Sequence, residues 1–249
     1  MRLRANLRLA RRLAALLAAL LVCLPLHGLW RMLRLPSPWP PRFLGWAARA
    51  CGVRARVFGD PLRRDVLFIA NHQSWLDILV LGGALDAAFV SKAEIGRAPV
   101  IGRLASLNRT IYVDREDRSA MPDQVAGVRA ALGETPVVIF PEGTTGDGET
   151  LLPFKSGLLQ ALDPPPPGVR AQPVLVDYGP AARAIAWTGE ESGLANALRI
   201  LRRPGVIRAT VRCLEPLDPA AVGGRKAIAA EARGRIAAAI EAYGDAPRA

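Results

Sequence analysis

Short apolar runs alternate with longer amphipathic stretches along the chain from residue 51 onward. The runs have the composition of strands that are buried in a sheet, and they cover residues 66–70, 88–90, 111–113, 137–140, 173–176 and 207–213. Helical spacing predicts helices at 75–85, 119–132, 194–203 and 219–243, the second of them capped by Ser119. This alternation predicts an α/β fold with a mixed, mainly parallel sheet flanked by helices.

The N-terminal segment has a different pattern, because residues 13–29 contain no charged side chain. Five arginines precede this run, and Arg31 and Arg34 follow it. The run is close to the ~20 residues that cross a bilayer. We predict an uncleaved hydrophobic anchor helix that spans or dips into the membrane, followed by an amphipathic helix near 43–50; a cleaved signal peptide is the alternative. The chain then divides into a basic, hydrophobic membrane anchor (1–50) and a folded domain (51–249).

The excess positive charge lies in the same segment. Eleven of the 33 lysines and arginines are in residues 1–56, which contain no acidic residue. The remainder of the chain has 22 basic and 22 acidic side chains, so the net charge of +11 belongs to the N-terminal segment. A nucleic-acid-binding domain would carry this charge on its folded body. Arginines that flank an apolar run favour an anionic membrane surface instead, and no nucleic-acid partner is expected.

The cysteines and histidines limit the chemistry further. The three cysteines form no CxxC pair and no metal-ligand spacing, which indicates a reducing compartment. Of the two histidines, His27 lies in the apolar N-terminal run, so only His72 is available to a site that faces water. One histidine is too few for a His-rich zinc site, which argues against a metal-dependent hydrolase.

The first polar block has the sequence NHQSWLD at residues 71–77, directly after a buried run. His72 and Asp77 are five positions apart, which on a continuous α-helix separates their side chains by ~140° around the axis. They can meet only if part of the interval is a turn, with Ser74 or a neighbour capping the helix. Asp77 would then accept the Nδ1 proton of His72 and leave Nε2 to take a proton from a hydroxyl. The alternative is a satisfied polar pair at a helix start.

The second polar block has the sequence FPEGT at residues 140–144, directly after another buried run. Its glycine allows backbone N–H groups to approach an anion or a developing oxyanion. Lys155 follows in the next loop, and Arg115 stands after the run 111–113, where a guanidinium can bind a phosphate or a carboxylate. The alternatives are an ordinary strand-to-loop turn and solvated charges.

Together these blocks resemble the glycerolipid acyltransferase family, of the 1-acyl-sn-glycerol-3-phosphate acyltransferase type. NHQSWLD resembles its NHxSxxD block, IYVDR at 111–115 its second block and FPEGT its third. Pro173 and Val174 lie where the family's last, proline-containing strand is expected. The resemblance covers about residues 52–215, and the order of four motifs makes it specific.

The resemblance implies a membrane-bound enzyme that moves an acyl chain from acyl-CoA or acyl-carrier protein to the free hydroxyl of 1-acyl-sn-glycerol-3-phosphate, which forms phosphatidic acid, or of a related lysolipid; lyso-ornithine lipid is the alternative acceptor. It implies His72 as general base and Asp77 as the residue that orients it. The implied acceptor-binding residues are Arg115, Glu142, Gly143 and Thr144, and the implied supporting residues are Asn71, Ser74, Pro141 and Lys155. No metal ion or bound cofactor is expected. The expected location is the bacterial inner membrane, with the catalytic domain on the cytoplasmic side.

One departure from the family pattern bears on the acceptor. Many members that form phosphatidic acid carry an arginine directly after FPEGT, whereas TGDG follows here at 145–148. This departure weakens the case for lysophosphatidic acid as the acceptor. Residues 140–157 and 178–203 resemble instead the bacterial branch that acylates lyso-ornithine lipid, whose headgroup is zwitterionic. The alternative of another class is a non-catalytic membrane lipid-binding protein. Acyl chain length, the choice of donor and the oligomeric state stay open.

Overall fold

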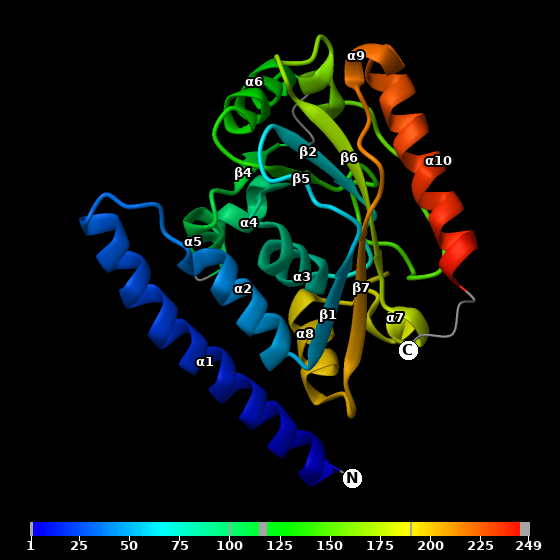
Figure 1. Ribbon diagram of the computed structural model, residues 1–249. Coiled ribbons are helices and arrows are strands. Elements are labelled where there is room, and N and C mark those ends of the chain that lie inside the picture. Colours follow the sequence, from blue (N-terminus) through cyan, green and yellow to red (C-terminus); the bar gives the residue numbers. More distant parts are fainter. Residues whose placement is uncertain (1, 100, 115–118, 190, 245–249) are drawn as a thin grey trace.

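The computed structural model describes residues 2–99, 101–114, 119–189 and 191–244, in which helices cover both faces of one sheet (Figure 1). The strands are β1 (Val53–Phe58), β2 (Val66–Ala70), β3 (Ala88–Lys92), β4 (Ile111–Val113), β5 (Val137–Ile139), β6 (Arg170–Asp177) and β7 (Ile207–Cys213). The helices are α1 (Arg2–Met32), α2 (Trp39–Ala50), α3 (Leu76–Leu85), α4 (Ala93–Arg97), α5 (Ile101–Leu107), α6 (Met121–Leu132), α7 (Ala182–Ile185), α8 (Gly193–Arg202), α9 (Pro219–Val222) and α10 (Arg225–Gly244). Two 3-10 turns are η1 (Leu158–Leu162) and η2 (Gly179–Ala181).

The seven strands are ordered β1-β7-β6-β2-β5-β3-β4. Every neighbouring pair is parallel except β6 and β7, which confirms the predicted mixed, mainly parallel sheet. β2 lies between β6 and β5 and is buried along its whole length. Strands that are covered on both faces are continuously apolar, and for this reason β2 could be predicted from the sequence.

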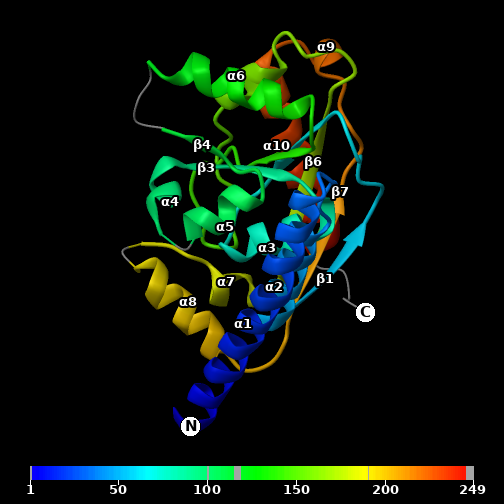
Figure 2. The ribbon, with the colours of Figure 1, turned by 90° about the vertical axis from the view of Figure 1, so that its left-hand side faces the viewer.

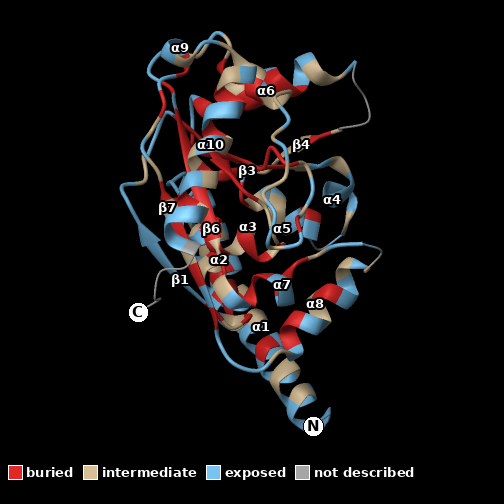
Figure 3. Cartoon of the chain, turned by 90° about the vertical axis from the view of Figure 1, so that its right-hand side faces the viewer, coloured by how far each residue is buried: buried red, intermediate tan, exposed pale blue. Residues whose placement is uncertain are grey.

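Two apolar layers fill the space between the sheet and its helices. Phe68 and Ala70 of β2 belong to a cluster that includes residues of α2, α3 and α8. Leu67 and Ile69, which alternate with them, belong to a second cluster with α6, η1 and α10. This alternation follows from strand geometry, in which successive side chains point to opposite faces. Figure 3 shows the central strands buried between these layers.

The structure corrects four details of the predicted elements. The expected helix 219–243 is interrupted at Gly223 and Gly224, whose φ angles of 84° and 83° lie outside the helical region. The helix predicted from 119 begins at Met121 after Ala120, without a side-chain cap, because Pro122 favours the first turn. β1 was not predicted: it is an edge strand with only Val53 buried, so it lacks a continuous apolar run. Helices α4, α5 and α7 were also not predicted.

The N-terminal helices form an antiparallel pair that packs on the sheet domain (Figures 1 and 2). α1 is long and apolar enough to cross a membrane, judged by length and composition. α2 packs on α3, and α1 contacts α2 and α8. The buried Arg12 guanidinium donates to the carbonyl oxygens of Ile200 and Leu201, which fixes α1 to the C-terminal end of α8.

Candidate active site

Three adjacent strands bring the candidate site together at one edge of the sheet. β6, β2 and β5 are neighbours and run parallel, so their carboxyl ends meet. The loops after them carry Tyr178, His72 and Glu142 respectively. Open α/β sheets bind ligands at this edge, and the placement of the two predicted blocks follows from strand order.

His72 and Asp77 meet across a turn, as their spacing required. Residues 71–75 are not helical, and α3 begins only at Leu76. His72 Nδ1 lies 2.8 Å from Asp77 Oδ2. The same oxygen accepts the backbone N–H groups of Gln73 at 2.7 Å and Ser74 at 2.9 Å. The carboxylate of Asp77, more than the hydroxyl of Ser74, therefore organises the start of the helix.

These contacts assign the tautomer of His72. An oxygen that already accepts two backbone N–H groups can only accept from the imidazole, so Nδ1 carries the proton and Nε2 has a free lone pair. The ring stacks on Phe140, with centroids 4.0 Å apart. Its side chain is 17% exposed, whereas Asp77 is fully buried. Within the described residues Nε2 has no hydrogen-bond partner, and it is available to a substrate hydroxyl.

Asn71 joins the catalytic turn to β6. Its side-chain amide donates to the carbonyl oxygen of Val176 at 3.0 Å and accepts the Val176 N–H at 2.7 Å. The residue is buried, so both bonds are protected from water. Asn71, predicted as a supporting residue, therefore joins the ends of β2 and β6 through two hydrogen bonds.

Glu142 connects the second block to the first. Its carboxylate accepts the backbone N–H of His72 at 2.6 Å through Oε1 and that of Leu152 at 3.0 Å through Oε2. Burial raises the pKa of Glu142, and the two backbone hydrogen bonds oppose that rise. Both oxygens are thus engaged with the protein, which makes Glu142 a brace for the His72 turn; the acceptor-binding role predicted for it stays a prediction.

The glycines of this loop are used in the same way. The Gly143 N–H donates to Phe140 O at 3.1 Å, and Gly143 has a φ of 77°, so it closes a turn that favours glycine. The Gly146 N–H donates to His72 O at 2.9 Å. These two amides are therefore occupied by the protein. The prediction that the glycines of this loop offer their amides to an anion is wrong for Gly143 and Gly146.

The remaining predicted residues lie around the loop. Pro141 is buried, and its carbonyl oxygen accepts the Lys155 N–H at 2.9 Å. The side chains of Thr144 and Lys155 are exposed. Arg115 lies outside the described residues, so its predicted contact with the acceptor stays a prediction. Among the described residues, no group of three or more His, Cys, Asp and Glu side chains is arranged to hold a metal ion.

Tyr178 is a site residue that the sequence analysis missed. Its hydroxyl donates to Asp77 Oδ1 at 2.6 Å, and both groups are buried. Burial, the charge of Asp77 and the hydrogen bond to it raise the pKa of Tyr178 well above its ordinary value. The available signal was its position directly after a buried strand, at the edge where the other site residues also follow strands.

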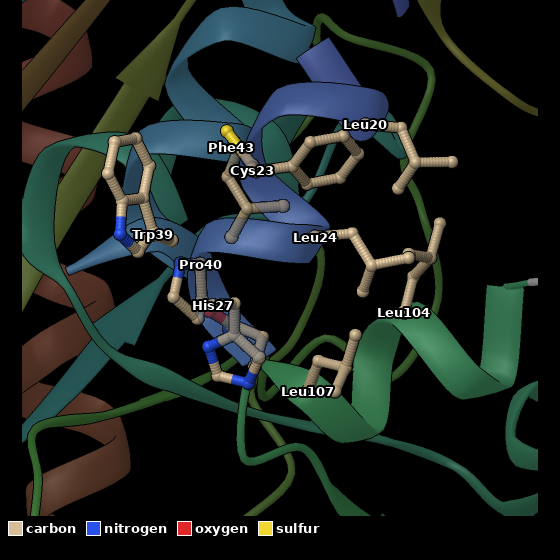
Figure 4. A pocket seen from close by; sticks show the side chains of 11 residues that line it. Leu20, Cys23, Leu24, His27, Trp39, Pro40, Phe43, Leu104 and Leu107 are labelled. Atoms are coloured by element: carbon tan, nitrogen blue, oxygen red, sulfur yellow. The ribbon is translucent and has the colours of Figure 1, made fainter. Parts of the chain in front are cut away.

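Two hollows lie on the surface near these elements. A small one beside His72 is lined by Asn71, His72, Gln73, Glu142, Gly148, Glu149, Thr150, Leu151 and Ile240. A more apolar one lies between α1, α2 and α5, where Figure 4 shows the side chains of Leu20, Leu24, Phe43 and Leu104 around it. The first of these two contains His72, the predicted base, and Glu142, so we take it as the candidate site.

The chain is similar to known acyltransferases in sequence and in fold. A family model described as "Acyltransferase" matches residues 54–176. The chain is 39% identical to a lyso-ornithine lipid O-acyltransferase of Rhizobium meliloti, over 76% of this chain and 70% of that protein. It is 32% identical to the enzyme of the same name from Brucella abortus, over 84% and 85%. The crystal structure of the 1-acyl-sn-glycerophosphate acyltransferase PlsC from Thermotoga maritima has the same fold, with a TM-score of 0.66 and 20% identity over 84% and 80%.

Proposed function

The chain belongs to the acyltransferase family and is a lysolipid acyltransferase, and from that premise we propose that His72 is its general base and lyso-ornithine lipid its acceptor. The observation that carries the proposal is the His72–Asp77 pair. Nδ1 is held by a buried carboxylate, while His72 lines the hollow at the carboxyl ends of the strands and its Nε2 has no hydrogen-bond partner among the described residues. This is the arrangement that a base needs to take a proton from a bound hydroxyl.

The proposed reaction is a direct transfer from thioester to alcohol. His72 Nε2 takes the proton of the lysolipid hydroxyl as its oxygen attacks the thioester carbonyl of acyl-CoA or acyl-carrier protein. The tetrahedral intermediate collapses with cleavage of the C–S bond, and the proton on His72 passes to the departing thiolate. One ester forms, one thioester is lost, and the base is regenerated. A thiol has a pKa of about 8.5, so its thiolate leaves without strong acid assistance.

Asp77 supports this base through charge and position. When Nε2 takes the proton, the imidazole becomes an imidazolium, and the carboxylate 2.8 Å from Nδ1 stabilises it. Asp77 is fully buried, so its interaction with the imidazolium is screened by water much less than a surface pair would be. No serine nucleophile is required, because the attacking alcohol is the second substrate.

The loop after FPEGT supports a zwitterionic acceptor. Two acidic residues, Asp147 and Glu149, lie there, and Glu149 lines the hollow beside His72. The described lining of that hollow contains no lysine or arginine. A phosphate headgroup prefers cationic partners, whereas the ornithine headgroup combines a carboxylate with an ammonium. The curated relatives from Rhizobium meliloti and Brucella abortus carry the name of that activity.

A parallel acyl-transfer assay tests the acceptor. We expect kcat/KM for lyso-ornithine lipid to exceed that for 1-acyl-sn-glycerol-3-phosphate by at least about 10-fold, since a pocket that pairs polar groups discriminates by this much or more. Purified protein in vesicles would receive labelled acyl-CoA or acyl-carrier protein with each lysolipid. A preference for 1-acyl-sn-glycerol-3-phosphate would refute the acceptor assignment and leave the family unchanged.

The proposed location is the cytoplasmic face of the bacterial inner membrane, where both thioester donors are found. We propose that α1 lies along the membrane surface with its apolar side inserted. Arg12 fixes its first half to α8, and its second half packs on α2, so the folded domain lies beside the helix rather than beyond one end of it (Figure 2). The opposite side carries exposed leucines: Leu3, Leu7, Leu13, Leu17, Leu21 and Leu29.

A double substitution on this side tests the membrane contact. Leu17→Glu combined with Leu21→Glu is expected to weaken vesicle binding by at least about 100-fold, because each buried leucine contributes roughly 1.5–3 kcal/mol. Flotation with anionic vesicles measures this directly. The matched control is Leu194→Glu with Val206→Glu, two exposed apolar residues of the folded domain. Equal flotation of the α1 variant and the control would argue against insertion of this face.

A further inference from the structure

Among the described residues, Tyr178 alone has a side chain that hydrogen-bonds Asp77 Oδ1, and it does so through its buried hydroxyl. The other carboxylate oxygen, Oδ2, takes all the remaining bonds, from His72, Gln73 and Ser74. Two oxygens of one carboxylate are therefore held from opposite sides. The turn holds one oxygen, and a residue 101 positions along the chain holds the other.

The surroundings keep Tyr178 in the donor role. The side chain is fully inside the apolar cluster on the α3 face of the sheet. Burial and the adjacent carboxylate raise its pKa well above the ordinary value, so the hydroxyl keeps its proton throughout the working range. A protonated phenol beside a carboxylate can only donate to it.

The backbone on either side of Tyr178 is also fixed relative to the site. Val176, two residues earlier, is clamped to Asn71 in both directions. Gly179, the next residue, donates its N–H to Asp177 at 2.8 Å as η2 begins. The end of β6 thus fixes the position of the Tyr178 hydroxyl relative to the buried carboxylate of Asp77.

We propose that Tyr178 is a positioning residue for acyl transfer, whose hydroxyl sets the orientation and charge distribution of Asp77 and through it the basicity of His72. The proposal rests on the proposed function, because it assigns Tyr178 to the pair that activates the acceptor hydroxyl. Tyr178 does not contact the imidazole and acts only through Asp77.

The test removes one oxygen atom. Tyr178→Phe keeps the ring in the core, and we expect kcat to fall about 10- to 100-fold, because Asp77 loses the buried hydrogen bond that orients its carboxylate toward His72. KM for the acyl donor and for the lysolipid should stay within about twofold. The matched control is Tyr112→Phe, which also deletes a hydroxyl that donates a hydrogen bond, to Gly102 O, away from the site.

The pH profile gives a readout that a purely structural role would not move. Without the phenol, the negative charge of Asp77 is less dispersed and holds the imidazolium more tightly, so the acid limb of kcat/KM should move to higher pH. The other ionisable groups of the described structure near His72 are Glu142, on its backbone N–H, and Glu149, in the hollow. Both are unchanged in Tyr178→Phe and in the control.

A spectroscopic measurement separates this proposal from the proposed function. The chain has two histidines, so the Nδ1 proton of His72 can be assigned by comparison with His27→Gln. We expect this downfield proton resonance to move in Tyr178→Phe and to stay in place in Tyr112→Phe. This result needs no substrate, so an inactive wild-type protein would refute the proposed function alone. An unchanged resonance, or a pH profile and kcat equal to those of the control, would overturn the role of Tyr178.

Discussion

Replacing His72 with alanine is expected to abolish measurable acyl transfer, lowering kcat by up to about 10⁴-fold, the upper end of the range for a general base. No other imidazole can substitute, because His27 is in the N-terminal helix and hydrogen-bonds Ser37 at 2.7 Å. The loss should appear in kcat with either thioester donor. Initial rates with labelled donor and lyso-ornithine lipid measure it.

His27→Ala is the matched control for this variant. It removes the other histidine of the chain and should leave kcat within about twofold, because His27 lies on α1, outside the hollow that contains His72. His72→Ala should fold normally, since the ring is at the surface of the hollow and stacks on Phe140 without filling the core. Turnover by folded His72→Ala near the wild-type rate would refute the general-base assignment.

Asp77→Asn is expected to lower kcat by about 10²- to 10³-fold, the second largest effect. The structure indicates how an asparagine would sit. The N–H groups of Gln73 and Ser74 both point at the position of Oδ2, so the amide oxygen must occupy it and the amide nitrogen must face Tyr178. The oxygen can still accept from His72 Nδ1. The tautomer is therefore retained, and what is lost is the charge that stabilises the imidazolium.

Two measurements check this reasoning. Steady-state kinetics should show the decrease in kcat without a matching change in KM for the donor. The Nδ1 proton of His72 should remain observable in Asp77→Asn and should vanish in Asp77→Ala, where no acceptor is left. Wild-type turnover by Asp77→Asn would show that the charge of Asp77 does not contribute to the reaction.

The elements that could be predicted were those with a local signal. The apolar runs that became β2 and β5 are buried along their whole length, so their composition alone identified them. β1 was not predicted, because Arg54 and Arg56 are exposed at the sheet edge, where a strand needs only one apolar face, and they interrupt the apolar run. The break in the C-terminal helix at Gly223 and Gly224 also has a local signal. It was not predicted, because the sequence on both sides is rich in alanine and typical of a helix.

The contact between His72 and Asp77 could be predicted from local sequence. His72 and Asp77 are joined by a five-residue interval, and the same interval supplies the Gln73 and Ser74 amides that hold the carboxylate. Every contact in that turn is between near neighbours, so spacing and residue type were enough to predict it. The basic, apolar N-terminal segment could be predicted for the same reason, because charge and hydropathy are properties of the local sequence.

The residues that surround this pair come from distant parts of the chain and depend on how the sheet packs. Tyr178 is 101 residues from Asp77, and Glu142 is 70 residues from His72. These contacts exist because β6 and β5 are the sheet neighbours of β2, and strand order depends on long-range packing rather than on any local pattern. For the same reason the loop glycines, expected to offer their amides to a ligand, donate them to Phe140 and His72 instead.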